Sequence, residues 1–570
     1  MTVVTRCSIA TLSTAICLAA ATWLTPATAA AGGFEIPDSG ARALGRGGAF
    51  VVGASDPTAL YYNPSLLSKQ RGTTVLINNN LAWHNTAFQR APLSAAWGAD
   101  AGTTFAEAND GSKLFPLGPF IAVASDFGLD NWTFGAGIYG PSAIGRHDYD
   151  DYGPQSFMLT EMDILLAYYS LSAAWKFKDV FGVGGTLQYV DMISMKYSLV
   201  TDATSSPGAG TLAPVPDSDS TQLVTELNLK DRFSGTAILG GWYRPHPRVE
   251  LGLASRVVPI FLKAKGGLTT DQPTLLSDDV TVELPMTLPA KVRGGVRYIH
   301  ETGEREQPWF DLELAAHYEN WSAIKAFDLD LEGEISGVPL VDLSIQKNWR
   351  DTVSLRLGGD VNVIPKYLTL RAGGFWESGA MRDNFSHLDF PSFMRGGISA
   401  GVSGGYKGIY LTVGYMHIFQ EDREVSEAAG KQFQERPLRP CPEFCDGLSG
   451  VPANAGKFTS HFDLLGLGLD IRFRELLGDG GGRKRRLERD RRRQEAAPPA
   501  ETPAETTPPP PTDPEPAAAT EPDEASETDA PDDTEPSEET DAAGPETDAD
   551  DPDAADDASD ADPATDDPAA

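Results

Sequence analysis

Long stretches of this chain alternate between apolar and polar residues with a period of two. In residues 352–363 (TVSLRLGGDVNV), Val or Leu occupies every odd position except 359, whereas Ser354, Arg356 and Asp360 occupy even ones. The same alternation recurs in residues 309–321 (WFDLELAAHYENW) and 461–473 (HFDLLGLGLDIRF). Successive side chains of a β-strand point to opposite faces. Each stretch therefore predicts a strand with one apolar and one polar side.

Fourteen segments of this kind are predicted as strands. They span approximately 73–83, 118–127, 131–140, 164–178, 180–198, 225–243, 248–264, 287–300, 308–324, 351–363, 366–377, 393–406, 408–420 and 459–473. Connections after odd-numbered strands are long, as at 84–117, 265–286 and 421–458, whereas those after even-numbered strands contain only a few residues. All long loops therefore lie at one end. This rhythm indicates an all-β fold, a 14-stranded antiparallel transmembrane β-barrel with short periplasmic turns and long extracellular loops.

Aromatic residues near the strand ends fit a membrane barrel, in which Trp and Tyr gather at the two lipid interfaces. We expect this role for Trp132, Tyr139, Trp175, Tyr189, Trp242, Tyr243, Tyr298, Trp349, Trp376, Tyr406 and Tyr410. A barrel with an even number of strands brings both of its ends to the periplasm. The predicted location is the cell outer membrane.

The N-terminus has the features of a secretory signal peptide, predicted over residues 1–31. Arg6 precedes an apolar run from residue 7 to residue 24, and small residues lie around Ala29 and Ala31. A helix that spans a membrane needs about 20 apolar residues, and this run is shorter. Residues 32–72 then precede the first strand and are predicted to form a plug, or hatch, within a barrel of residues 73–473.

The C-terminal part has a different composition. Residues 495–570 hold 27 of the acidic residues and 16 prolines, with no Lys, Arg or aromatic residue. Such a segment cannot bury enough apolar surface to offset its ordering entropy, so a disordered periplasmic tail is predicted. Of the formal net charge of −35, the tail carries −27 and the rest −8. The linker, residues 474–494, contains the basic run RKRRLERDRRR, which is expected to meet an anionic membrane surface.

The chain shows no pattern of catalysis or of cofactor binding. Gly40 and Gly45 have the outer spacing of a P-loop, but Arg46 and Gly47 stand where Lys and Ser or Thr are required. Neither a zinc-protease motif nor a Ser/His/Asp grouping is visible, so no enzyme is predicted. Cys441 and Cys445 are expected to form a disulfide in an oxidising compartment, and no metal site is expected, because further ligands at zinc-like spacing are missing.

Several runs together resemble one family. They are GFEIPDSGARALGRGGAF, DPTALYYNPSLL, LPAKVRGGVRY, ENWSAI, WRDTVSLRLGGDVNVIPKYLTLRAGGFWESGAMRD and LTVGYMHIF. In this order they resemble the outer-membrane long-chain fatty acid transporter family of the FadL/TodX type, which also includes aromatic-hydrocarbon channels. The resemblance covers most of residues 32–473. Ser65-Leu66 departs from the Ala-Gly that follows Asn-Pro in the family.

The resemblance implies a mechanism and its residues. Extracellular loops collect a hydrophobic ligand, an internal site beside the plug binds it, and plug movement with a gap in the wall releases it sideways into the membrane. The implied ligand-binding residues are Phe34, Tyr61 and Tyr62, and the plug corner is Asn63 and Pro64. Candidates for the lateral gap are Gly135, Gly137, Gly140 and Pro141, with ordinary barrel glycines as the alternative. Candidate collecting loops are 156–166 and 268–288, which can equally be strand extensions beyond the membrane.

The predicted function is plug-gated passive uptake of long-chain fatty acids or similar hydrophobic compounds. Two alternatives are an envelope-anchoring barrel whose acidic tail binds a periplasmic partner, and a general diffusion porin. The expected partners are hydrophobic small molecules, outer membrane lipids and lipopolysaccharide. Nucleic acid is not expected as a partner, because a chain exported to the envelope does not meet it, and the predicted state is a monomer.

Overall fold

The computed structural model describes residues 39–95, 101–111, 114–140, 146–203, 222–301, 308–438 and 452–477. All of them belong to the first of two compact units, residues 1–496 and 497–570. The predicted signal peptide and the acidic tail lie outside the described residues, as do Phe34, Pro141, Cys441 and Cys445. Among the described residues, no helix is long and apolar enough to cross a membrane.

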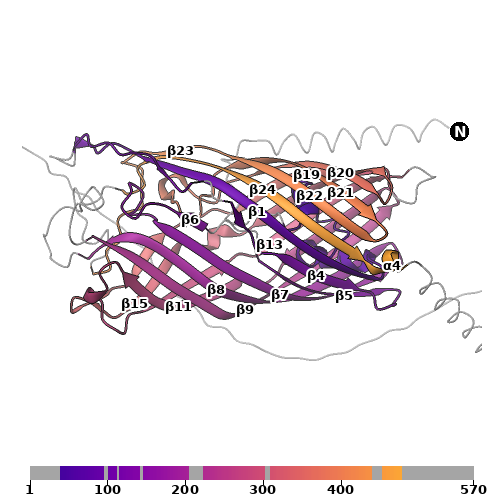
Figure 1. The fold of residues 1–570 in the computed structure, drawn as a ribbon, viewed down its shortest axis with the longest axis horizontal. Helices are drawn as coiled ribbons and strands as arrows, with labels where there is room; N and C mark the ends of the chain where they lie inside the picture. The colour runs from indigo at the N-terminus through magenta and orange to yellow at the C-terminus, as the bar shows by residue number, and fades with distance from the viewer. Residues whose placement is uncertain are drawn as a thin grey trace, which may run out of the picture. The chain divides into compact units, whose positions relative to one another are not determined.

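Fourteen antiparallel strands close into a barrel (Figure 1), as predicted. In order around the wall they are β1 (Thr73–Arg90), β4 (Phe120–Ser125), β5 (Trp132–Tyr139), β7 (Glu161–Phe177), β8 (Phe181–Asp202), β9 (Gln222–His246), β10 (Val249–Arg256), β13 (Lys291–His300), β14 (Phe310–Glu319), β19 (Thr352–Ile364), β20 (Leu368–Glu377), β21 (Arg395–Tyr406), β22 (Ile409–Gln420) and β24 (Gly456–Arg472). Closure comes from β1 and β24, which pair from Thr74 opposite Arg472 to Arg90 opposite Gly456. No barrel edge is left there, as lipid requires.

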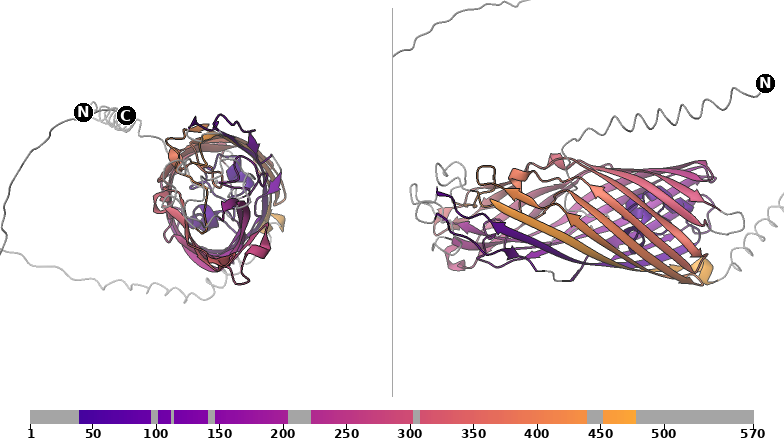
Figure 2. Two further views of the ribbon diagram at one scale, coloured as in Figure 1. Left: turned by 90° about the vertical axis from the view of Figure 1, so that its left-hand side faces the viewer. Right: turned by 90° about the horizontal axis from the view of Figure 1, so that it is seen from above.

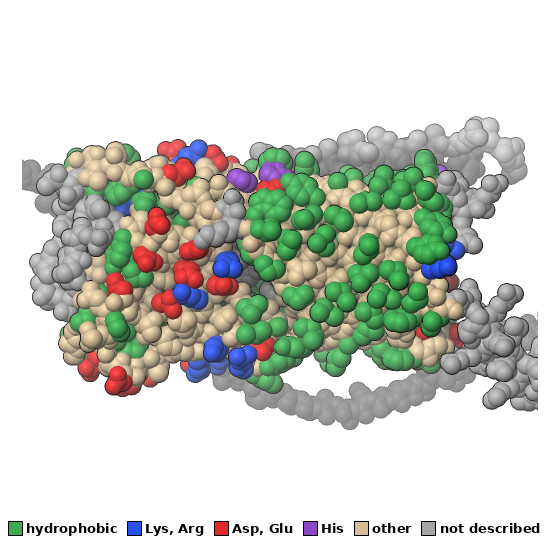
Figure 3. Space-filling model, in the orientation of Figure 1, with side chains coloured by type: hydrophobic (Ala, Val, Ile, Leu, Met, Phe, Trp, Pro, Cys, Tyr) green, Lys and Arg blue, Asp and Glu red, His purple; other side chains and the backbone are tan. Residues whose placement is uncertain are grey.

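The strands turn their apolar faces outward and their polar faces inward. On β19, Leu355 is 48% exposed, whereas its neighbour Arg356 is 1% exposed. On β14, Leu314 points out while Glu313 is fully buried. Figure 3 shows the result as an apolar belt over one half of the barrel, with charged side chains over the other. This arrangement is the reverse of a soluble sandwich and places the belt in lipid.

The prediction of an aromatic girdle is only partly right. Trp132, Tyr298 and Trp376 are exposed on the outer surface. Tyr139, Trp242 and Trp349 are instead buried within the barrel, so their assignment to the girdle was wrong. Tyr139 and Trp242 lie on inward-facing positions of β5 and β9, whereas Trp349 lies in the loop before β19 and packs against Trp321. Nearness to a strand end does not determine the face on which a side chain lies, because adjacent residues alternate.

The seventh and eighth predicted strands are each interrupted. Chain 248–264 divides into β10 and β11 (Ile260–Thr270), and β12 (Thr281–Leu288) precedes β13. Across the break, side chains of β9 replace ladder bonds: Thr236 Oγ1 donates to Val258 O at 2.5 Å. β11 and β12 pair with each other, so much of the long connection at 265–286 is strand and not irregular loop. Of the two collecting-loop candidates, 268–288 largely forms strand extensions, with η3 (Pro273–Leu275) between them.

Shorter elements complete the described structure. They are β2 (Ala108–Asn109), β3 (Phe115–Pro116), β6 (Arg146–Asp148), β15 (Ala326–Glu332), β16 (Glu334–Ile335), β17 (Val338–Pro339), β18 (Leu343–Gln346), β23 (Arg423–Val425), η4 (Trp321–Ala323), η5 (Asp383–Phe385) and α4 (Phe473–Leu476). Residues before β1 form α2 (Ala41–Leu44), α3 (Ala59–Tyr62) and η1 (Pro64–Lys69). Figure 2 shows this segment inside the ring of strands. We call residues 39–72 the plug.

Candidate functional site

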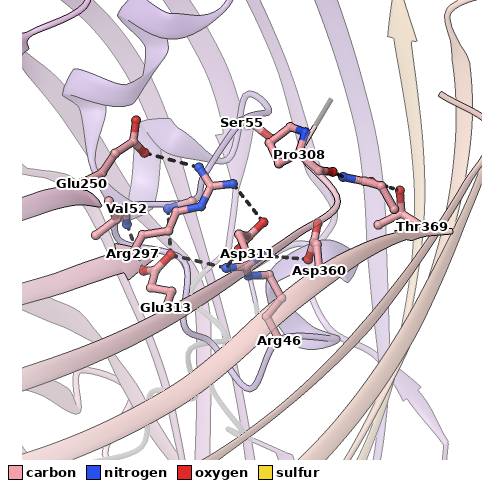
Figure 4. A network of polar contacts seen from close by, with 12 residues as sticks. Arg46, Val52, Ser55, Glu250, Arg297, Pro308, Asp311, Glu313, Asp360 and Thr369 are labelled. Carbon is pink, nitrogen blue, oxygen red and sulfur yellow. Dashed lines mark hydrogen bonds and ion pairs between the residues drawn. The ribbon is translucent and has the colours of Figure 1, made fainter. Parts of the chain in front are cut away.

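An ion network fixes the plug to the wall, with Arg46 at its centre (Figure 4). Arg46 Nη1 lies 2.7 Å from Asp360 Oδ1 on β19, and Nη2 lies 2.8 Å from Asp311 Oδ1 on β14. Glu313 lies 3.5 Å from the same Nη2. All four side chains are buried. One plug cation is therefore matched to three wall carboxylates in a place where unpaired charge is costly.

The same carboxylates also hold other groups. Glu313 accepts hydrogen bonds from the backbone nitrogens of Val52 at 2.9 Å and Gly53 at 2.7 Å. Arg297 Nη2 donates to Asp311 Oδ2 at 2.9 Å. Both plug backbone and plug side chain are thereby anchored to β14, as Figure 4 shows.

The run LGRGGAF, residues 44–50, fits the plug against the wall. Gly47 has a φ of 65°, and a Cβ there would lie 2.6 Å from the backbone nitrogen of Gly374. Gly45 approaches Gly401 almost as closely, since its added Cβ would lie 3.1 Å from the Gly401 Cα. Only glycine satisfies both the conformation and the approach at residue 47. The glycines therefore serve close packing around Arg46.

The predicted plug corner joins the plug to β9 of the wall. Asn63 Nδ2 donates to Val51 O at 3.0 Å within the plug and to Gly241 O of β9 at 3.2 Å. Its Oδ1 accepts from the Ser65 hydroxyl at 2.6 Å and caps η1, which Pro64 begins. An Asn-Pro pair meets these needs because the amide both donates and accepts, whereas proline fixes φ at a helix start.

Tyr61 and Tyr62 belong to a buried aromatic cluster that runs from the plug to the wall. Their rings meet edge to face with centroids 4.9 Å apart, and the Tyr61 ring lies 6.0 Å from that of Tyr139 on β5. Tyr139 stacks on Phe120 of β4 at 4.3 Å. The guanidinium of Arg293, on wall strand β13, lies 4.3 Å from the Tyr61 ring centroid. The cluster leads from the plug corner to the wall at β4 and β5.

Directly beyond this cluster the wall ladders are interrupted. The β5–β7 ladder ends at Tyr139 opposite Tyr168 and resumes with β6, at Arg146 opposite Asp163. The β1–β4 ladder ends at Phe120, and pairing to β1 resumes at Pro116 of β3. We call this stretch, beside Gly118 and Gly140, the wall opening. The two glycines approach each other closely, since a Cβ added at Gly118 would lie 3.2 Å from the Gly140 Cα. The wall opening carries no regular strand pairing on the described part of the chain.

An apolar cavity of about 140 Å³ lies at the wall opening. Wall residues line one side of the cavity and lumen residues line the other. A continuous strand ladder would separate these two sets of residues. The wall side includes Gly118, Gly140, Arg146 and Leu165, and the lumen side Met192, Leu262, Met286, Leu288 and Phe390. Leu165 faces outward, whereas Met192 and Leu288 are buried inside. The cavity lining therefore includes residues from both faces of the wall.

The predicted lateral-gap glycines lie in two different surroundings. The ladders are continuous at Gly135 and Gly137, whose missing side chains make room for Leu60 and Leu67 of the plug. Gly140 lies at the wall opening itself. Sequence reasoning missed Arg46 and its carboxylate partners as a site. The signal was present, because Asp311, Glu313 and Asp360 occupy the inward face of predicted strands.

Extracellular loops contain a second buried charge cluster. Lys347 Nζ lies 2.5 Å from Asp389 Oδ2, and both side chains are fully buried. Burial lowers the pKa of Lys347, whereas the adjacent carboxylate opposes that shift. Burial also raises the pKa of Glu435 to about 7, with Lys347 acting in the opposite direction. The pKa of this described loop carboxyl group therefore lies near neutral pH.

Comparisons with known proteins agree with this geometry. Residues 21–440 match the family described as outer membrane protein transport protein (OMPP1/FadL/TodX). A Pseudomonas aeruginosa FadL homologue is 17% identical, with a TM-score of 0.61, over 78% of this chain and 100% of that one. The P. putida toluene transporter TodX is 14% identical, with a TM-score of 0.54, over 76% and 98%. The Ralstonia pickettii toluene transporter TbuX is 15% identical, with a TM-score of 0.52, over 76% and 98%. The comparison with curated proteins gives no match.

Proposed function

The chain belongs to the OMPP1/FadL/TodX family of outer membrane transport proteins, and from this premise we propose that it releases small hydrophobic molecules sideways through the wall opening. It is an outer membrane transporter for hydrophobic compounds. The observation that supports the proposed route is the mostly apolar cavity beside Gly118 and Gly140, which has both lumen and outer-surface residues in its lining.

The size and lining of the cavity favour a ligand of about one aromatic ring or a few methylene groups. An apolar cavity of about 150 Å³ lined by Leu, Ile and Phe takes up benzene. The present cavity is of about 140 Å³, with Leu, Met and Phe side chains on its lumen side. Burying each methylene contributes about 0.8 kcal/mol. A monoaromatic hydrocarbon therefore fits as a whole, whereas a fatty acid would pass with only part of its chain enclosed.

The plug favours a sideways route over a straight one. Arg46, Glu313 and Asn63 attach it to β14, β19 and β9. A path along the barrel axis requires these buried contacts to break, whereas the wall opening lies outside them. Transport by this route is passive, because the gain on entering the membrane drives release. In this proposal, plug movement changes the internal binding site beside Tyr61 and Tyr62 and does not open a path along the barrel axis.

Uptake by cells tests the route. A Cβ at Gly140 would lie 3.2 Å from Leu166 O, so Gly140→Leu fills the opening. Gly404→Leu is the matched control, since nothing lies within 4 Å of an added Cβ there. We expect uptake of radiolabelled toluene to fall at least tenfold in Gly140→Leu and to stay unchanged in the control. Equal uptake by both variants would rule out the sideways route.

The same cells separate the alternative functions. Labelled palmitate in place of toluene reports whether long-chain fatty acids use the opening. Swelling of proteoliposomes in small sugars, unchanged by Gly140→Leu, would favour a general diffusion porin. Uptake no higher than in cells lacking the protein would leave the anchoring alternative.

A further inference from the structure

Three polar side chains from separate segments converge on one buried point near the extracellular rim of the wall opening. His84 lies on β1, Asp110 directly follows β2, and His147 lies on β6. His84 Nδ1 lies 3.1 Å from Asp110 Oδ2, and His147 Nδ1 lies 2.8 Å from the same oxygen. All three side chains are buried, and the three donor atoms lie within 4.8 Å of one another.

From this geometry we infer a binding site for a divalent transition metal, of which Zn²⁺ is the best-fitting member, formed by His84, Asp110 and His147. Two imidazole nitrogens and one carboxylate oxygen are a donor set that zinc accepts. Tetrahedral bonds of about 2.0–2.1 Å place donor atoms about 3.3 Å apart. The two histidine–carboxylate distances of 2.8 and 3.1 Å need to open by about 0.2–0.5 Å, and the two imidazole nitrogens lie within 4.8 Å of each other. Water completes the coordination.

The hydrogen bonds around His84 support a cation. His84 Nε2 lies 2.9 Å from the carbonyl oxygen of Arg146, which can only accept, so Nε2 carries a proton. In neutral His84 the Nδ1 lone pair then faces the Asp110 carboxylate, which is another acceptor. A metal ion between them converts this contact into two bonds. A backbone carbonyl on the outer nitrogen is also the usual partner of a metal-bound histidine.

Asp110 is oriented towards both histidines. Asp110 Oδ1 accepts from the Thr86 backbone nitrogen at 3.1 Å, which leaves Oδ2 to both histidines. On the described part of the chain, His147 Nε2 is buried without a hydrogen-bond partner. The rings of Phe115, Phe462 and Tyr149 lie within about 6 Å of the two imidazoles and pack around them. This enclosure holds the donor atoms in place.

The position of the site suggests what a bound ion does. β2 pairs with β1 and β6 pairs with β7, so the three ligands join the two sides of the wall opening. Arg146 and Phe115 contact His84 and also line the cavity. A bound ion would brace the extracellular rim. This consequence rests on the proposed route, whereas metal binding itself does not.

Metal titration of the full-length protein in detergent, after treatment with EDTA, tests the site. We expect one tight Zn²⁺ per chain by calorimetry, above weak binding by the acidic tail. The affinity should fall at least tenfold in Asp110→Asn and in His147→Gln. The affinity should stay unchanged in His417→Gln, which serves as the control. His417 lies outside the cluster, and its Nδ1 also pairs with a carboxylate, that of Asp463, at 2.8 Å. Tight binding that is equal in all four proteins would overturn the assignment.

Two further readouts make the test independent of variant folding and of transport. Heat-dependent mobility on gels reports whether each variant forms a barrel. Co²⁺ added to the unmodified protein should give the visible absorption of a four-coordinate ion with histidine ligands, and its absence would also overturn the site. Toluene uptake with and without Zn²⁺ is measured separately. Zn²⁺ that binds but leaves toluene uptake unchanged would contradict the bracing role and leave the metal site standing.

Discussion

The guanidinium of Arg46 lies 2.7 Å from the carboxylate of Asp360, which pairs a plug residue with a wall residue 314 positions later in the chain. Both side chains are buried, and Asp311 lies on the other side of the same guanidinium at 2.8 Å. Two carboxylates from neighbouring strands β14 and β19 therefore share one plug cation. The plug position is thereby coupled to the charge on the inner wall.

Removing the Arg46 cation should release the plug. Arg46→Met leaves Asp311, Glu313 and Asp360 buried without their common partner, and breaking a buried pair costs about 3–5 kcal/mol. We expect a higher and noisier single-channel conductance in planar lipid bilayers. Arg71→Met is the control, because Arg71 is one-third exposed and lies 4.0 Å from Asp126, so that pair contributes about 0–1 kcal/mol.

A compensated variant completes this test. In Arg46→Met with Glu313→Gln, one positive and one negative charge are removed together, whereas Asp311 keeps Arg297 and Asp360 keeps Arg371, so the conductance should return towards that of the unmodified protein. A single Arg46→Met variant with unmodified conductance would contradict the role of the network.

The barrel was predictable because lipid imposes a simple rule on each strand. Leu355 and Arg356 are adjacent, and alternation alone assigns one to the outside and the other to the inside. The rule does not assign aromatic residues at strand ends. Trp242 and Tyr243 are neighbours, so only one can face lipid, and the structure turns Trp242 inward to donate to Ser68 at 3.0 Å. That choice depends on the plug, which has no repeating pattern.

The candidate site was visible only in part for a related reason. The run LGRGGAF and the Asn-Pro corner indicated a plug, and the inward carboxylates of 309–321 indicated a polar lumen. Which carboxylate meets Arg46 depends on how the plug sits against the wall, which sequence spacing does not encode. The grouping of His84, Asp110 and His147 depends likewise on the pairing of β2 and β6 with the long strands.

The plug corner should depend on the donor function of Asn63. Asn63→Asp keeps an acceptor for Ser65 but removes the amide hydrogens that reach Val51 O and Gly241 O. Leaving buried partners unsatisfied costs about 1–3 kcal/mol each. We expect faster hydrogen exchange of backbone amides in residues 59–70. Ser65→Ala removes one hydroxyl donor and should have a smaller effect, and equal exchange in both variants would argue against the corner as an anchor.

Enlarging the cavity should change ligand size preference. Met286 lines its lumen side, and Met286→Ala removes three heavy atoms from a buried position. We expect naphthalene uptake to rise relative to toluene uptake, with a destabilisation of about 2–5 kcal/mol. Met381→Ala is the matched control, because Met381 is fully buried outside the cavity lining. The same naphthalene-to-toluene ratio in both variants would contradict passage through the cavity.

The extracellular loops should become less protected as the pH rises through neutrality. Burial raises the pKa of Glu435 to about 7 from its ordinary 4.5, so the folded loop favours the protonated carboxyl group. This contribution is complete below about pH 4.5 and is lost as the pH rises through about 7. Charged and titratable neighbours of the site are Lys347, Asp389 and Tyr197.

Hydrogen exchange of residues 421–438 between pH 5 and pH 8, corrected for the intrinsic rate, measures this effect. One proton linked to loop opening changes the protection factor by at most about tenfold per pH unit. We expect protection to fall across this range in the unmodified protein and to stay flat in Glu435→Gln, which cannot ionise. A fall of equal size in both proteins would assign the pH dependence to another group in the loops.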